Sequence, residues 1–161
     1  MAAWVLESAH RYARASAILL DAHLMYESEV NAALSMELLI KSLLVRPVEN
    51  SRAGTVAQQY SSKHVKVPGG HDLFKLYEKV SPEVAERVGL VYHADLLMAK
   101  SDVFMRLRYI YEEGSPGGST NLLLNAVLSI IPQVVHFFIE SGSDDKWLLY
   151  MKDNPTSLAI R

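Results

Sequence analysis

The chain has 161 residues, no cysteine, and a formal net charge of −2 from 16 basic and 18 acidic residues. Its length predicts a single domain over residues 1–161 with one sizeable core. The lack of cysteine excludes disulfide scaffolds, zinc–thiolate sites and thiol catalysis, and it is typical of the cytoplasm, where we expect the protein. Because the two signs of charge are mixed, nothing draws the whole chain toward nucleic acid or an anionic membrane.

Residues 2–24 are predicted to form a long helix. Residues that suit a core-facing stripe recur along it at helical spacing: Val5, Ala9, Tyr12, Ala13, Ser16, Leu19, Leu20 and His23. The alanines and Ser16 would let a neighbouring helix approach closely. Charged residues interrupt the apolar ones throughout the segment, so we do not expect it to be a signal peptide.

The central element of the predicted fold is a helix over residues 29–45, with Ser28 as its N-cap. Apolar residues lie on nearly every side of it: Val30, Ala33, Leu34, Met36, Leu38, Leu39, Ile40, Leu43, Leu44 and Val45. A helix that is apolar almost all round must be covered by several neighbours, which predicts an all-α domain. Within it, Glu37 and Lys41 are four residues apart, a spacing that suits pairing on one face; they are either a surface pair or anchors for charges from other helices.

Residues 47–70 show no convincing periodicity, and we expect a long loop. A loop of this length is unusual in a compact domain, so it is either functional or mobile. It is basic, with one acid, Glu49, against Arg46, Arg52, Lys63, His64 and Lys66. We favour a solvated, mobile loop over one that contacts phosphate.

Three further helices are predicted between residues 71 and 113. The first is short and begins after Asp72, which is placed to cap it. The second begins at Ser81-Pro82-Glu83, a cap followed by proline and an acid in the first turn, and is expected to reach about Ala99. The third follows a cap at Ser101-Asp102.

Glycines in the stretch 114–118 break the chain before the last long helix, which Ser119 or Thr120 is expected to cap and which ends near Gly142. Residues 122–139 are strongly apolar, but polar residues recur along one strip: Asn125, Ser129, Gln133, His136 and Glu140. This pattern favours an amphipathic bundle helix over a membrane span, and no membrane is expected as a partner. In the tail, residues 143–161, an apolar cluster at 147–151 is expected to fold back onto the bundle.

Three stretches, in this order, resemble the HEPN domain. The central helix has Ala33, Glu37 and Lys41 at the spacing of that family's Ala-x-x-x-Glu-x-x-x-Lys segment. The stretch Gly70-His71-Asp72-Leu73 resembles the family's short-helix start, and the stretch 104–112 resembles a Phe-x-x-x-Arg-Tyr-x-Tyr-Glu pattern of bacterial members. The resemblance implies an up-down helical bundle of about five to six helices that often dimerises, in bacterial defence or toxin–antitoxin-type systems.

Many HEPN proteins are metal-independent ribonucleases with an arginine, four to six residues, and then a histidine near the start of the fourth long helix. The histidine moves the 2′-hydroxyl proton and the arginine holds the phosphate. Here no histidine follows Arg106 or Arg108 in the expected helix. The spacing occurs only in the preceding helix, between Arg87 and His93.

We therefore expect a non-catalytic binding or interaction protein, with no catalytic residues. Two alternatives stay open. The first is a metal-independent ribonuclease that uses Arg87 and His93. The second is an RNA- or nucleotide-binding module that uses Arg106, Arg108 and the loop from Lys63 to Lys66. A homodimer through the helix over residues 120–141 or through the first helix is expected, and a protein partner is compatible with the same interpretation.

The candidate site is a binding or structural polar network of Arg108, Tyr109, Glu112, Glu37, Lys41, Arg106, His71 and Asp72. Arg108 stands among residues typical of a core, so we expect it to be partly desolvated and paired with Glu112 or Glu37. No histidines have metal-ligand spacing, and the glycine-rich stretch 114–120 lacks the Gly-Lys-Ser/Thr of a phosphate loop, so no metal or cofactor is expected.

Overall fold

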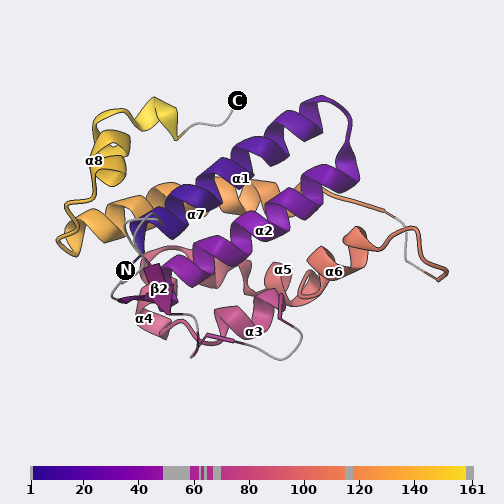
Figure 1. The fold of residues 1–161 in the computed structure, drawn as a ribbon, viewed down its shortest axis with the longest axis horizontal. Helices are drawn as coiled ribbons and strands as arrows, with labels where there is room; N and C mark the ends of the chain where they lie inside the picture. Colours follow the sequence, from indigo (N-terminus) through magenta and orange to yellow (C-terminus); the bar gives the residue numbers. More distant parts are fainter. Residues whose placement is uncertain are drawn as a thin grey trace.

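A computed structural model describes residues 2–48, 59–61, 63, 65–66, 70–114 and 118–158. The described chain is an all-α helical bundle with one small pair of strands (Figure 1). In chain order the elements are α1 (Ala3–Asp21), α2 (Met25–Leu44), β1 (Arg46–Val48), β2 (Gln59–Ser61), α3 (Leu73–Tyr77), α4 (Pro82–Arg87), the 3₁₀ helix η1 (Leu90–His93), α5 (Ala94–Ala99), α6 (Val103–Arg108), α7 (Leu122–Glu140), α8 (Lys146–Asp153) and the 3₁₀ helix η2 (Pro155–Ser157).

Helices α1 and α2 form a closely packed antiparallel hairpin. Small residues line the contact, and serine hydroxyls bridge the two backbones across it. The hydroxyl of Ser16 donates to the carbonyl of Ser28 at 2.8 Å, and that of Ser28 donates to the carbonyl of Ser16 at 2.8 Å. Ser35 donates to the carbonyl of Ala9 at 2.7 Å. These buried hydroxyls are satisfied, so the small-residue stripe expected on the first helix does allow close approach.

Helix α2 is the central helix, as predicted: it packs against α1, α3, α6 and α7. Its first turn differs from the prediction. The helix begins at Met25, and Ser28 lies inside it, buried against α1, instead of capping it. The preceding turn contains no glycine and is closed by His23 in the left-handed region, with φ of 62°.

The segment after α2 contains a short antiparallel pair that the sequence analysis did not predict. β1 and β2 pair with Arg46 opposite Ser61 and Val48 opposite Gln59. Val65 is buried against Ala2 and Val45, so part of the expected loop packs on the bundle. Most of the loop that was predicted to be mobile, residues 49–58, 62, 64 and 67–69, lies outside the described residues.

Two of the three predicted start signals in the middle of the chain are confirmed, whereas Asp102 precedes α6 without a side-chain cap hydrogen bond. Asp72 accepts a hydrogen bond from the Lys75 amide at 3.0 Å, and Ser81 accepts one from the Val84 amide at 3.4 Å. The helix expected from residue 82 to Ala99 is wrong in its length. Helix α4 ends at Arg87, and the chain turns at Gly89, which has a φ of 74°, before η1 and α5 begin. Glycine in the left-handed conformation is a common helix terminator.

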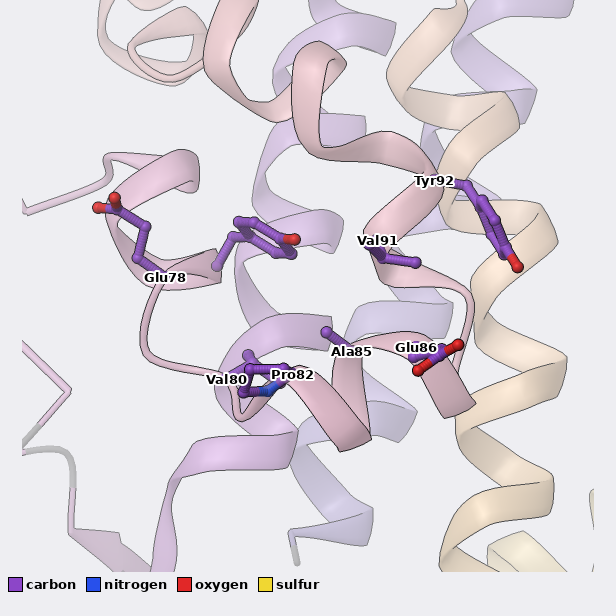
Figure 2. A pocket seen from close by; sticks show the side chains of 8 residues that line it. Glu78, Val80, Pro82, Ala85, Glu86, Val91 and Tyr92 are labelled. Carbon is purple, nitrogen blue, oxygen red and sulfur yellow. The ribbon is translucent and has the colours of Figure 1, made fainter.

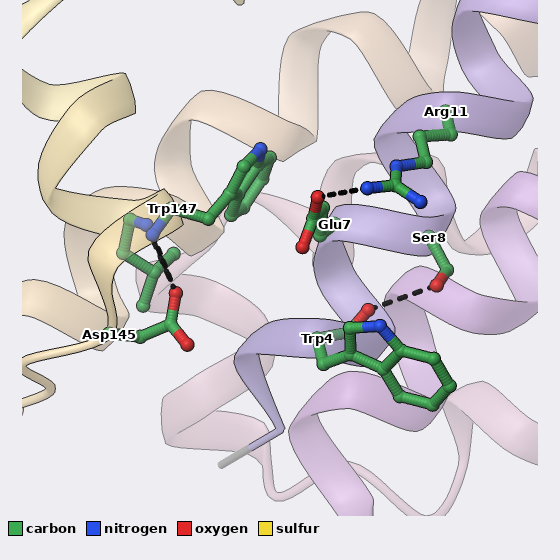
Figure 3. Close-up of polar contacts among 7 residues, drawn as sticks. Trp4, Glu7, Ser8, Arg11, Asp145 and Trp147 are labelled. Atoms are coloured by element: carbon green, nitrogen blue, oxygen red, sulfur yellow. Dashed lines mark hydrogen bonds and ion pairs between the residues drawn. The ribbon is translucent and has the colours of Figure 1, made fainter. Parts of the chain in front are cut away.

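Helix α7 lies along the hairpin, and α8 folds back onto it. Leu148 and Met151 are buried, so the apolar cluster of the tail packs on the bundle as predicted. Asp145 caps α8, and Trp147 extends from α8 toward α1 (Figure 3).

The predicted cap of α7 is wrong, because the helix begins after Asn121 with no side-chain cap. Helix α7 is long and apolar enough to cross a membrane, but half of its most apolar window is buried within the fold, as in the core helix of a bundle.

Candidate functional site

Three residues of the predicted polar network, Lys41, His71 and Glu37, meet at the carboxylate of Glu37, whose side chain is only 4% exposed. Its Oε1 lies 2.5 Å from the Lys41 ammonium nitrogen, one turn further along α2. Its Oε2 lies 2.7 Å from Nδ1 of His71, just before α3. Both carboxylate oxygens are therefore engaged, and a buried carboxylate needs such partners. Glu37 and Lys41 pair along α2, and the fold brings His71, another member of the predicted network, to the same carboxylate from a distant part of the sequence.

Aromatic contacts extend this network to α6. The ring of His71 lies 4.5 Å from that of Phe104. The guanidinium carbon of Arg108 lies 5.9 Å from the centre of the Phe104 ring and 5.6 Å from that of Tyr109, within the range of cation–π attraction. The surface over His71, Phe104, Arg108 and Tyr109, here called the α6 surface, thus combines the Arg108 charge with aromatic rings.

The expectation that Arg108 is desolvated and ion-paired is wrong. Its side chain is exposed, and none of the ion pairs among the described residues joins it to Glu112 or Glu37. Helix α6 is short, Val103–Arg108, and its buried residues are Val103 and Leu107. Arg108 follows Leu107 and therefore lies on the outward side of the helix.

The other members of the predicted network lie apart from Glu37. Asp72 caps α3 and lies 3.1 Å from the Lys75 ammonium. Arg106 is paired with Asp102 at 3.8 Å along α6. Glu112 is exposed beyond the end of that helix. These contacts are local and connect residues close in sequence.

A second buried carboxylate, Glu29, is missing from the predicted network. Its side chain is fully buried, with Lys100 at 2.6 Å from Oε1 and the backbone amide of Thr120 at 2.8 Å from Oε2. It joins α2 to the end of α5 and the approach to α7. In the predicted helix over residues 29–45, Glu29 falls in the first turn, where an acid ordinarily faces water and the helix dipole, so the sequence does not indicate its burial. The available signal is the spacing: Glu29, Ala33 and Glu37 share one face of α2.

The pair that matches the nuclease spacing does meet in space. Arg87 and His93 line one hollow of about 330 Å³, together with Glu86, Val88, Gly89, Tyr92, Ser129, Ile130 and Gln133, here called the polar hollow. His93 Nε2 lies 3.3 Å from the Ser129 hydroxyl, and burial lowers the pKa of His93. The Arg87 guanidinium lies 2.7 Å from a carboxylate oxygen of Glu140 on α7.

A larger hollow of about 690 Å³ adjoins the polar one. It lies between α3, α4 and η1 and is lined by Tyr77, Glu78, Val80, Pro82, Ala85, Glu86, Val91 and Tyr92, here called the apolar hollow (Figure 2). Glu86 and Tyr92 line both hollows. The helix break at Gly89, which the periodicity does not show, separates Val91 from α4 and opens the space.

Within the described part of the chain, no three His, Asp or Glu side chains converge in a way that could hold a metal ion. No protein-family model matches the sequence, and comparisons with curated proteins and with solved structures find no matching protein.

Proposed function

We propose that this chain is a HEPN-like binding or interaction protein without catalytic activity, cytoplasmic and part of a bacterial defence or toxin–antitoxin-type system. The observation that carries the binding function is the pair of adjoining hollows that share Glu86 and Tyr92. Concave surfaces with an apolar part and a few polar groups are where proteins take ligands and partner side chains.

The charges around the polar hollow argue against cleavage of RNA. Arg87 is bound to Glu140, and the Glu86 carboxylate lines the same space. A phosphodiester entering there meets two carboxylates beside one guanidinium, so its net attraction is weak. The ribonuclease alternative has one observation in its favour: Arg87 and His93 line one hollow, and a lowered pKa keeps the imidazole neutral, as a general base requires.

Incubation of the pure protein with labelled RNA, with and without EDTA, tests the choice. We expect no cleavage in either condition. Metal-independent cleavage that His93→Ala removes, and that the control His136→Ala on α7 retains, would overturn the proposal in favour of the ribonuclease. A salt-dependent mobility shift without cleavage, weakened by Arg108→Ala, would instead identify an RNA-binding module on the α6 surface.

Homodimerisation is part of the proposal, and α1 supports it better than α7. The outward face of α1 exposes Trp4, Tyr12 and Ile18, the last with 63% of its surface accessible. Leu122, at the first turn, is the large apolar residue that α7 leaves exposed. Light scattering at tens of micromolar should give a dimer mass that Ile18→Lys reduces, whereas Leu122→Lys should leave it unchanged. A monomer mass for the parent protein would contradict this part of the proposal.

A further inference from the structure

We infer that the apolar hollow binds a small organic ammonium ion, a primary amine attached to an aromatic or aliphatic body. This inference rests on the proposed binding function and names its ligand class. The hollow is large enough for such a molecule, at about 690 Å³, and it is a separate space from the one that holds Arg87 and His93.

The floor of the hollow is suited to an apolar body. Val80 and Ala85 are buried beneath it, and Pro82 and Tyr77 add apolar surface. Beside them, Tyr92 has 82% of its surface exposed and Val91 has 40%. An aromatic ring this exposed next to an apolar hollow gains by covering an apolar ligand, since both surfaces then leave water.

The charge of the hollow selects a cation. Among the eight residues that line it, Glu78 and Glu86 are charged acids and none is a lysine, arginine or histidine. None of the ion pairs given for the described residues involves either carboxylate. Of the neighbouring cations, Lys75 and Arg87 are engaged by Asp72 and Glu140, and Lys79 follows Glu78 in the chain. An anionic ligand would be repelled here, whereas an ammonium ion on the Glu86 side would gain one nearby carboxylate.

The position of the ammonium group follows from the arrangement of the side chains. Glu86 and Tyr92 lie on the same side of the hollow in Figure 2, with Glu78 on the other. An ammonium ion at the Glu86 carboxylate therefore lies on the Tyr92 side of the hollow. Its body then extends over Val80, Pro82 and Ala85.

Three probes of similar shape and different charge test the inference: phenethylamine, 2-phenylethanol and 3-phenylpropionate. Each is titrated into the ¹⁵N-labelled protein, and shifts of the Ala85, Val91 and Tyr92 amides are followed by NMR. We expect the amine to bind most tightly and the acid most weakly. Equal affinity for the three probes, or no shift with the amine, would overturn the inference.

Two matched variants test whether the Glu86 carboxylate binds the ammonium group. Glu86→Gln should weaken amine binding roughly two- to fivefold, as expected for an exposed ion pair, and leave the alcohol unaffected. The control is Glu83→Gln, an exposed acid on the same helix that does not line the hollow. Amine binding unchanged in Glu86→Gln overturns the assignment. Tighter binding of Nα-acetyl-lysine amide than of phenethylamine overturns the choice of a small molecule over a protein side chain.

The amine titration and the RNA assay fail independently. RNA cleavage removed by His93→Ala would refute the proposed function whatever the amine does. Binding of 2-phenylethanol or 3-phenylpropionate without a preference for the amine would refute the ligand class and leave a binding protein in place.

Discussion

The α1–α2 hairpin and the segment from α4 to α6 are built in opposite ways. The hairpin has two long helices of 19 and 20 residues, sealed by small residues and reciprocal serine hydrogen bonds. The other segment is divided into short helices of four to six residues, with turns before η1 and before α6 and with η1 running directly into α5. Long helices bury continuous stripes and leave little room between them. Short helices change direction before their stripes are complete, and the two hollows described above lie against them.

The largest effect on stability is expected from removing the Glu29–Lys100 ion pair, which joins these two regions. Glu29→Ala removes a fully buried carboxylate and leaves the Lys100 ammonium, 15% exposed, without its partner. Loss of one member of a buried pair costs about 3–5 kcal/mol, so we expect a large fall in the free energy of unfolding, measured by urea denaturation.

The matched control is Glu27→Ala, an exposed acid in the first turn of the same helix, which should change the free energy of unfolding by less than about 0.5 kcal/mol. Equal stability of the Glu29 and Glu27 variants would show that the hairpin and the short-helix segment are not joined through this carboxylate.

A smaller effect on stability is expected at Gly89, where the chain turns between α4 and η1. Gly89 has a φ of 74°, and an added Cβ would find its nearest neighbour, Cδ2 of Tyr92, at 3.8 Å. Gly89→Ala therefore meets no clash, and its cost is the left-handed conformation alone, about 1 kcal/mol. Thermal denaturation should show a modest decrease in Tm. Gly142→Ala, with φ of 86° after α7, provides a comparison at the end of a long helix.

A stabilised Gly89→Ala protein would indicate that the chain prefers the continuous helix that the periodicity predicts. In that case the apolar hollow should also close, and phenethylamine binding should be lost. The two measurements together therefore test whether the break is what creates the hollow.

These two regions also differ in how well the sequence predicts them. The central position of α2, the small-residue stripe of α1 and the caps at Asp72 and Ser81 follow from local patterns, and the structure contains them. The pairing of β1 with β2 does not follow, because strands of three residues are too short to show alternation. The break at Gly89 was missed because apolar spacing continues on both sides of it.

The candidate site is predictable only in part, for a related reason. Glu37 and Lys41 are one turn apart, so their pair can be read from spacing. The contact of Glu37 with His71 and that of Glu29 with Lys100 depend on how distant helices meet. Arg108 was misplaced because apolar neighbours along six residues do not determine which way a short helix faces.

His10, on α1, is expected to make the stability of the fold depend on pH. His10 is buried beside Trp147, its Nε2 has no hydrogen-bond partner among the described residues, and burial and then the charge of Arg14 lower its pKa. A histidine with a lowered folded pKa leaves stability intact above its unfolded value of about 6.5, and stability is lost as pH falls below that value.

We therefore expect His10→Gln to flatten the decline in Tm between about pH 6.5 and 5 relative to the parent protein. His136→Gln is the control, because His136 is 70% exposed and lies beside Glu140. If the two variants follow the same pH curve as the parent, His10 does not link protonation to the packing of α8 on α1.

The smallest effect on stability is expected at Arg108, on the short-helix side of the comparison. Its guanidinium is exposed and lies over the rings of Phe104 and Tyr109. Exposed cation–π contacts contribute about 0.5–1 kcal/mol, well below the cost of removing Glu29. Arg108→Ala should therefore leave Tm nearly unchanged, and Arg108→Lys should have still less effect because it keeps the charge. The matched position is Arg106, which is paired with Asp102 on the same helix and is 23% exposed. If Arg108→Ala lowered Tm as much as Glu29→Ala does, the guanidinium would have to be buried in solution, and the α6 surface would be part of the core instead of a surface open to a ligand.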